Sequence, residues 1–133
     1  MSLLGATKGT ELEPQVEQLL NLEKDGSALY LALAYVARQQ GLSKLAEGLE
    51  HIAADEARHA GLYAIMNGKV TEDLLPILTN IAEQESKAES VLAPIVERCR
   101  ELELREVAEE IDKAAKEEVR HGKMIHGLIE KYL

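Results

Sequence analysis

The chain has 133 residues, which is enough for one domain with a hydrophobic core and too few for two domains of ordinary size. It is rich in Ala, Leu, Glu and Lys and has only four aromatic residues and three prolines, a composition that favours helices over sheets. The formal net charge of -9, without any cluster of Lys and Arg, argues against binding to a nucleic acid.

Cysteine content and hydropathy indicate where the protein resides. Cys99 is the only cysteine, so an intramolecular disulfide is excluded and a reducing compartment is the simplest setting. The N-terminal stretch of residues 1–5 is too short and too uncharged for a secretory signal. No run of about 18 apolar residues is present to span a membrane. We therefore expect a cytoplasmic protein that binds neither nucleic acid nor membrane.

Two amphipathic helices are predicted in the first half of the chain, over about residues 14–40 and 43–66. Apolar residues recur at steps of three and four along one face of each segment. Gly41 predicts the end of the first helix and Ser43 is expected to cap the second, which Asn67 and the following glycine end.

Two more helices are predicted in the second half. The third begins near Thr71, which is expected to cap it, and extends to a turn near Glu103, and the fourth follows from Leu104. Residues 1–12 are expected to form a poorly ordered tail, and residues 13–133 a single domain. The predicted class is all-α, a four-helix bundle.

The two halves of the sequence repeat each other with an offset of 62 residues. Each half has a Glu on the apolar face of its first helix, and a Glu followed three residues later by His on that of its second. The bundle therefore consists of two repeated helical hairpins. The matched pairs are Glu23 and Glu85, Glu56 and Glu118, His59 and His121, Arg38 and Arg100, and Leu42 and Leu104.

The chemistry of this repeated pattern points to metal. Glu and His three residues apart lie on one face of a helix, about one turn apart, and can bind the same ion or adjacent ions. Four carboxylates in an apolar core would cost several kcal/mol each in desolvation unless protons, bases or cations neutralise them. Two divalent cations would do so, and mixed oxygen and imidazole donors suit iron or manganese. The predicted ligands are Glu23, Glu56, His59, Glu85, Glu118 and His121.

An alternative is that these six residues form a metal-free network of Glu–His hydrogen bonds between helices. The remaining candidates are weaker. His51 and His126 do not repeat between the halves and lie off the ligand face, so we interpret both as surface residues. Cys99 lies 14 residues beyond Glu85, about 21 Å along a helix, and is interpreted as core packing.

Several stretches resemble the rubrerythrin group of the ferritin-like superfamily. Residues 36–41 (Val-Ala-Arg-Gln-Gln-Gly) and 56–60 (Glu-Ala-Arg-His-Ala) are similar to the first hairpin of that family, and residues 106–109 (Glu-Val-Ala-Glu) and 118–121 (Glu-Val-Arg-His) to the second. The similarity covers nearly all of the chain after residue 13. It implies a ferritin-like bundle holding two iron ions, or manganese in their place.

The resemblance also implies roles for individual residues. Glu56 and Glu118 would bridge the two ions, and the other four ligands would each bind one. Tyr30 matches a family tyrosine beside the site and is a candidate proton donor. The family has a further metal-binding Glu where this chain has Ala88, which predicts a more symmetric site.

The activity that the resemblance implies is reduction of hydrogen peroxide to water. Rubrerythrins commonly carry a rubredoxin module with paired cysteines, which a chain with one Cys cannot contain, so a rubredoxin-like protein or a reductase would supply electrons. One alternative is a ferroxidase that oxidises Fe(II) with oxygen for iron handling. A third hypothesis is a helical interaction module without metal.

The segment between the second and third helices is short for this topology, in which it must cross the bundle lengthwise. Glu85 follows His59 by only 26 positions. Either the third helix is unwound as far as Pro76 or beyond, or the hairpins of two chains exchange in a homodimer. We favour the dimer.

Overall fold

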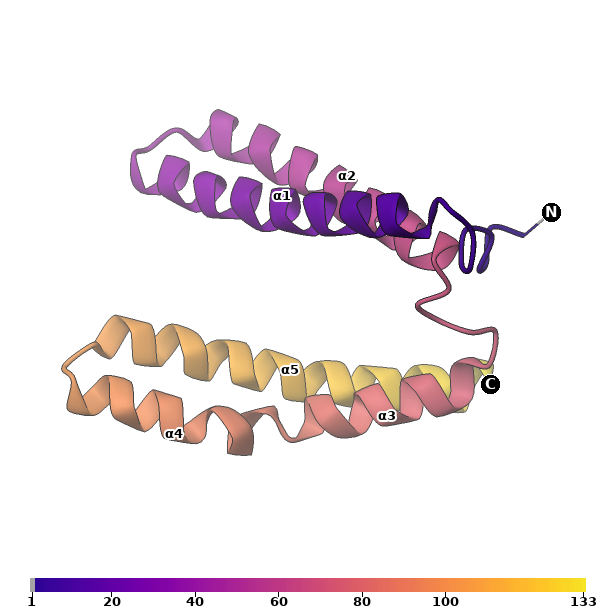
Figure 1. The fold of residues 1–133 in the computed structure, drawn as a ribbon. Helices are drawn as coiled ribbons and strands as arrows, with labels where there is room; N and C mark the ends of the chain where they lie inside the picture. Colours follow the sequence, from indigo (N-terminus) through magenta and orange to yellow (C-terminus); the bar gives the residue numbers. More distant parts are fainter. Residues whose placement is uncertain (1) are drawn as a thin grey trace. The chain divides into compact units, whose positions relative to one another are not determined.

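The computed structural model describes residues 2–133, which form helices and no strand (Figure 1). This confirms the all-α class. The chain divides into two compact units, with the boundary between Thr71 and Glu72. The helices are α1 (Glu13–Gln39) and α2 (Ser43–Met66) in the first unit, and α3 (Leu74–Ser86), α4 (Ala88–Glu101) and α5 (Arg105–Tyr132) in the second.

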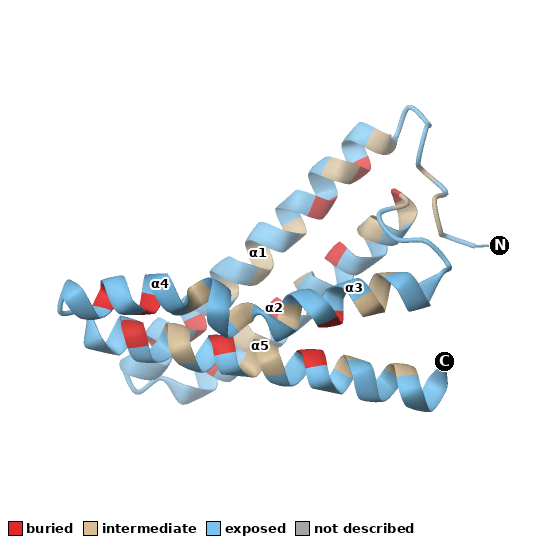
Figure 2. Ribbon diagram, turned by 90° about the horizontal axis from the view of Figure 1, so that it is seen from below, coloured by how far each residue is buried: buried red, intermediate tan, exposed pale blue. Residues whose placement is uncertain are grey.

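The first unit is a hairpin of α1 and α2 with a core of small residues. The buried residues of α2 are all alanines, and α1 adds two more beside Val16 and Leu20. Figure 2 shows these buried positions as isolated bands on helices that are otherwise exposed or half-buried. Small side chains let two helix backbones approach closely. The buried alanines are Ala34, Ala37, Ala46, Ala53 and Ala60.

The second unit repeats this hairpin, with α3 and α4 both packed along α5. Its buried residues fall at the positions that the offset of 62 predicts, so the duplicated hairpin is confirmed. Cys99 lies in this core, in contact with Val96 and Ala108, as predicted. The matched buried pairs are Ala34 and Val96, Ala37 and Cys99, Ala46 and Ala108, and Ala53 and Ala115.

The turns of the two hairpins have the same backbone conformation. Gly41 has a φ of 77° and Glu103 a φ of 61°. In each turn the next residue donates a backbone hydrogen bond to a carbonyl five residues back, at 2.9 Å in the first hairpin and 2.8 Å in the second. This is the left-handed closure that commonly ends a helix. The turn predicted near Glu103 is therefore confirmed.

The prediction of one continuous third helix was wrong. The helix begins at Leu74 and breaks at Lys87, whose N–H bonds to the carbonyl of Gln84 only three residues back. Two local features weaken the run on either side of the break. The Ser86 hydroxyl bonds back to a carbonyl four residues earlier, which bends helices, and Pro94 lacks the N–H that would continue the ladder.

The alternative in which this helix stays unwound as far as Pro76 was also wrong. Pro76 lies in the first turn of α3, where a missing N–H removes no helical hydrogen bond. The predicted caps differ as well. Leu42 rather than Ser43 precedes the first helical residue of α2, and Asp73 rather than Thr71 precedes that of α3, with no side-chain cap bond at either. In α2 the reason is that the tight turn at Gly41 leads directly into the helix.

Residues 2–12 differ from the poorly ordered tail that we expected. They form a series of turns whose backbone amides bond to the C-terminal end of α2, from Gly5 to Ile65 and from Thr7 to Met66, both at 2.9 Å. Asn67, only 3% exposed, joins this segment to α1. Its side chain accepts from the Thr7 hydroxyl and donates to the backbone carbonyl of Glu13.

Both hairpins keep large apolar side chains at the surface. No large side chain is fully buried in the described residues, and Leu22, Leu29 and Leu33 of α1 are all exposed. Each hairpin therefore has apolar surface available for further packing. Of the helices described, none has the length and hydropathy to cross a membrane.

Candidate metal centre

The first hairpin brings its three predicted ligands together. Glu23 projects from the middle of α1, and Glu56 and His59 from one face of α2. One ligand atom of each lies within 4.8 Å of the other two. Nδ1 of His59 is 3.7 Å from Oε1 of Glu23. The three-residue spacing places Glu56 and His59 one turn apart, so both reach the same side of the Ala-lined helix contact.

The second hairpin has the same arrangement. Glu85 comes from the last turn of α3, and Glu118 and His121 from α5, again with ligand atoms within 4.8 Å of one another. Nδ1 of His121 lies 3.5 Å from Oε2 of Glu118 and 4.0 Å from Oε2 of Glu85. We call these groups the first triad (Glu23, Glu56, His59) and the second triad (Glu85, Glu118, His121).

One carboxylate oxygen in each triad is shielded from solvent and has no hydrogen-bond partner. These atoms are Oε2 of Glu23 and Oε2 of Glu85, which are equivalent in the repeat. A buried acceptor without a partner is unfavourable, and few occur in native proteins. That it recurs at equivalent positions argues against chance. A cation bound within each triad would satisfy this oxygen and offset the negative charge.

The two carboxylates of the second triad interact directly. A hydrogen bond with Glu118, together with burial and the negative charge of Glu118, raises the pKa of Glu85. The same hydrogen bond, with the contribution of His121, lowers the pKa of Glu118. A divalent cation bound beside these two adjacent carboxylates would offset their mutual repulsion.

The donor set determines which metals fit. Each triad offers carboxylate oxygens and one imidazole nitrogen, without thiolate, and this combination suits iron or manganese. The residues present therefore fit the predicted cofactor. All six predicted ligands lie in the two triads. That the two triads form one centre stays a prediction.

The other predicted residues are placed as follows. Tyr30 is half-buried on α1, seven residues after Glu23, and its role as a proton donor stays a prediction. His51 is largely exposed and lies 3.9 Å from Asp55, and His126 is exposed, so the surface interpretation of both is confirmed.

One contact near the first triad was not predicted. The Ser27 hydroxyl donates to the backbone carbonyl of Ala53 at 3.2 Å, joining α1 to α2 one turn after Glu23. A serine on the apolar face of a helix, four residues after a candidate ligand, was the available signal. The bond fixes the two ligand-bearing helices relative to each other.

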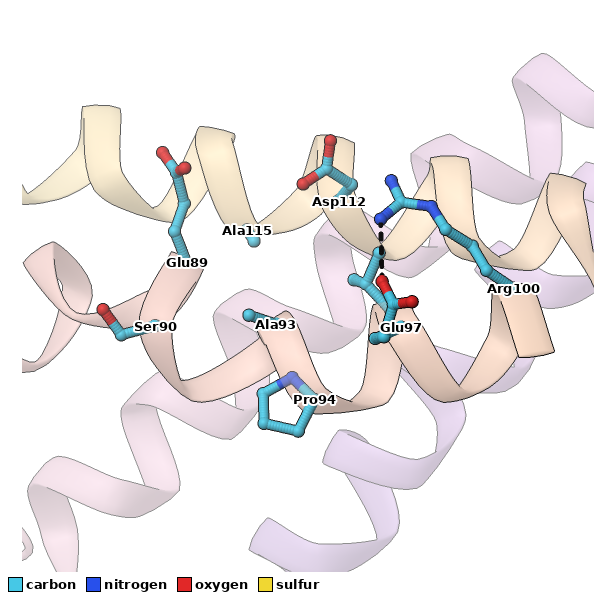
Figure 3. Close-up of a pocket in the computed structure, with 9 residues that line it drawn as sticks. Glu89, Ser90, Ala93, Pro94, Glu97, Arg100, Asp112 and Ala115 are labelled. Atoms are coloured by element: carbon cyan, nitrogen blue, oxygen red, sulfur yellow. Dashed lines mark ion pairs between the residues drawn. The ribbon is translucent and has the colours of Figure 1, made fainter.

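Of the hollows in the second hairpin, two differ in their relation to the candidate ligands. The larger, of about 500 Å³, lies between α4 and α5 and contains none of the ligands (Figure 3). Arg100 borders it and pairs with Glu97 at 3.5 Å. The other, of about 370 Å³, lies directly beside Glu85 and Glu118 and is lined mainly by apolar surface. Its remaining lining residues are Gln84, Ala88, Val91 and Leu92.

Comparison with known proteins agrees with this geometry. The family model for rubrerythrin matches residues 17–129. An uncharacterised protein of Methanocaldococcus jannaschii is 35% identical over 97% of this chain and 92% of its own length. Reverse rubrerythrin-1 of Clostridium acetobutylicum is 26% identical over 97% of this chain and 73% of its own length. No solved structure gives a significant match. The chain belongs to the rubrerythrin family.

Proposed function

We propose that this protein is a non-haem diiron oxidoreductase that reduces hydrogen peroxide to water. The observation that carries the proposal is the pair of Glu-Glu-His triads, each with a shielded carboxylate oxygen that lacks a partner. Membership of the rubrerythrin family supports an oxidoreductase of the diiron type. Manganese is the alternative metal.

The six side chains of the two triads would hold two ions. By the family resemblance, Glu56 and Glu118 would each bind both ions, and the remaining two carboxylates and two imidazoles would each bind one. When bound, two ferrous ions supply the two electrons that, with two protons, convert one hydrogen peroxide into two molecules of water. The four carboxylates offset the added positive charge of the oxidised pair.

Residues around the triads would handle the oxidant and its protons. The apolar hollow beside Glu85 and Glu118 has room for a small uncharged molecule such as peroxide and little polar surface to hold bulk water. Tyr30 is the candidate proton donor, through its phenolic hydroxyl.

Electrons would come from another protein. A rubredoxin-type centre needs several cysteines, and the 133 residues contain one, which is buried in the core of the second hairpin. The proposed donor is a rubredoxin-like protein or a reductase.

We propose that the complete centre forms in a homodimer in which hairpins are exchanged. In a ferritin-like bundle the link between α2 and α3 runs the length of the bundle. From Glu56 to the end of α2 is about 15 Å, and from the start of α3 to Glu85 about 16 Å. A link that crosses the bundle must cover both distances together. The eight steps from Met66 to Leu74 cover at most about 29 Å when fully extended, which is already slightly less.

The link is not fully extended, because its first residues bond back to α2. The amides of Asn67, Gly68 and Lys69 donate to carbonyls of the last turns of α2. The remaining residues are too few to cross, so the second hairpin of another chain would complete the bundle. Light scattering should give a dimer mass, and a monomer that binds two irons would contradict the exchange.

Iron loading tests the function. The protein is loaded anaerobically with Fe(II), the bound iron is counted, and the complex is mixed with peroxide or with oxygen. We expect about two irons per pair of triads and faster oxidation by peroxide. Faster reaction with oxygen and continued iron uptake would instead indicate a ferroxidase. Absence of any divalent metal binding would leave the metal-free interaction module.

Variants of the ligands make this test specific. Glu56→Gln and Glu118→Gln should each lower the bound iron, since each removes one anionic ligand from one triad. Glu110→Gln is the control, because Glu110 is an exposed residue of α5 outside both triads. Equal iron content in all three variants would contradict the assignment of the ligands.

A further inference from the structure

The helices α3 and α5 approach each other closely at Gly122, next to the candidate ligands. Gly122 follows His121 on α5 and is buried against the last turn of α3. A Cβ atom at Gly122 would lie 2.8 Å from the Ser86 hydroxyl, 3.0 Å from the backbone carbonyl oxygen of Ala82 and 3.2 Å from the backbone nitrogen of Ser86. Two of these atoms are backbone, so a side-chain rotation cannot relieve the crowding.

This contact lies at the level of the second triad. Ser86 directly follows the ligand Glu85, as Gly122 follows the ligand His121. The separation of α3 and α5 at this level determines whether the Glu85 carboxylate, 4.0 Å from His121, can share an ion with it. A methyl group between the helices would move the end of α3 outward and carry Glu85 with it.

The first hairpin has a different residue at the equivalent position. Ala60 occupies it and is buried, so the helices there accommodate a Cβ. Only the second hairpin therefore requires a residue without a side chain at this position. In the second hairpin, α3 also ends at Ser86, directly after the candidate ligand Glu85.

We infer that Gly122 is a positioning residue of the proposed metal centre: its contact with Ser86 and Ala82 holds Glu85 within reach of Glu118 and His121. The inference rests on the proposed function and adds a residue that binds no metal itself. Groups that position metal ligands typically change affinity by a factor of about 10 to 100.

Cobalt binding to the full-length protein tests this inference. Co(II) is titrated into the metal-free protein, and its visible absorption reports the number, affinity and coordination of the sites. Gly122→Ala should leave one site unchanged, weaken the other by about tenfold and alter its spectrum. Gly127→Ala is the matched control, since it makes the same exchange in the same helix and its Cβ would meet nothing within 4 Å.

A second substitution separates positioning from general damage. Ser86→Ala, added to Gly122→Ala, removes the hydroxyl at 2.8 Å and leaves the two backbone contacts. The double variant should recover part of the lost affinity. Should Gly122→Ala fail to fold, the double variant decides, because a weakened second site relative to Gly127→Ala supports the inference and two unchanged sites contradict it.

The outcomes distinguish this inference from the proposed function. Two cobalt sites in the unmodified protein, with both unchanged in Gly122→Ala, would overturn the role of Gly122 and leave the metal centre standing. Equal weakening by Gly127→Ala would also overturn it. No cobalt binding by the unmodified protein would remove both the centre and the positioning role.

Discussion

Glu103 and Gly41 occupy equivalent turns of the two hairpins, 62 residues apart, and both have a left-handed backbone. Glycine adopts this conformation without steric cost, whereas a residue with a Cβ is disfavoured there. The first turn thus has the residue that its geometry favours, and the second has the same geometry with strain.

This relationship predicts that substitutions at the two positions change the free energy of unfolding in opposite directions. Glu103→Gly should raise the free energy of unfolding by about 1 kcal/mol, and Gly41→Ala should lower it by about 1 kcal/mol. Urea denaturation measures both. Gly48→Ala is the control, since Gly48 lies within α2 with open space around it, and alanine there should stabilise the helix. Destabilisation by Glu103→Gly would contradict the strain at this turn.

The repeat made the turn at Glu103 predictable, because Gly41 marked its counterpart. The break at Lys87 was not predictable in the same way. No glycine or proline lies at that point, and the corresponding part of α1 is continuous. The break depends on a serine hydroxyl bond and on Pro94 seven residues later, features that helix periodicity does not register.

Asn67 is the polar residue on which the N-terminal segment depends. Asn67→Ala should lower the free energy of unfolding by about 1 to 3 kcal/mol, because it leaves the half-buried partners of the Asn67 amide without a bond. It should also speed proteolysis of residues 2–12. Asn80→Ala, at an exposed position of α3, provides the control. Equal stability of the two variants would show that the segment contributes nothing.

The ion pair beside Asn67 predicts a pH dependence. Lys69, at 2.9 Å, and the amide of Asn67 lower the pKa of Glu17 below its ordinary value of 4.5. The stabilisation from ionised Glu17 is therefore present above pH 4.5 and is lost as the pH falls through the lowered value.

Denaturation of the metal-free protein at several pH values checks this sign. Glu17→Gln should be less stable than the unmodified protein at pH 7, and the difference should shrink at acidic pH. Glu11→Gln, an exposed change nearby in the chain, should show no such dependence. A difference that grows towards acidic pH would contradict the role of the pair.

The repeat also exposes a difference in surface pairing. Arg38 donates two hydrogen bonds to Glu50, both at 2.9 Å, whereas Arg100, its counterpart, pairs with Glu97. The counterpart of Glu50 is Asp112, which is one methylene shorter and pairs with Lys116 instead, at 2.9 Å.

Lengthening this acid should restore the missing pair. Asp112→Glu should stabilise the second hairpin by about 0.5 kcal/mol, the usual scale of a partly exposed ion pair. Urea denaturation at low ionic strength measures it. The gain should vanish when Arg100→Gln is added, and a gain that persists in the double variant would show another cause.

The grouping of the six candidate ligands into two triads could be predicted from the sequence, whereas the role that we infer for Gly122 could not. The sequence shows charged or polar residues on otherwise apolar helix faces, at a spacing that brings them close together on a helix. These residues are Glu23, Glu56 and His59 and their repeats in the second hairpin. Gly122 gives no such signal, since a glycine within a helix has many explanations, and only the distance to α3 shows what it permits.

The break at Lys87 gives the two acids of the duplicated chain unequal freedom. Glu23 lies in the interior of α1, a helix of 27 residues, so its backbone can be displaced only if the whole helix moves. Glu85 lies two residues before the break, and fraying of one terminal turn can shift it alone. Two equivalent acids of the repeat therefore differ in how firmly their helices hold them, with Glu23 the more rigid and Glu85 the more adjustable.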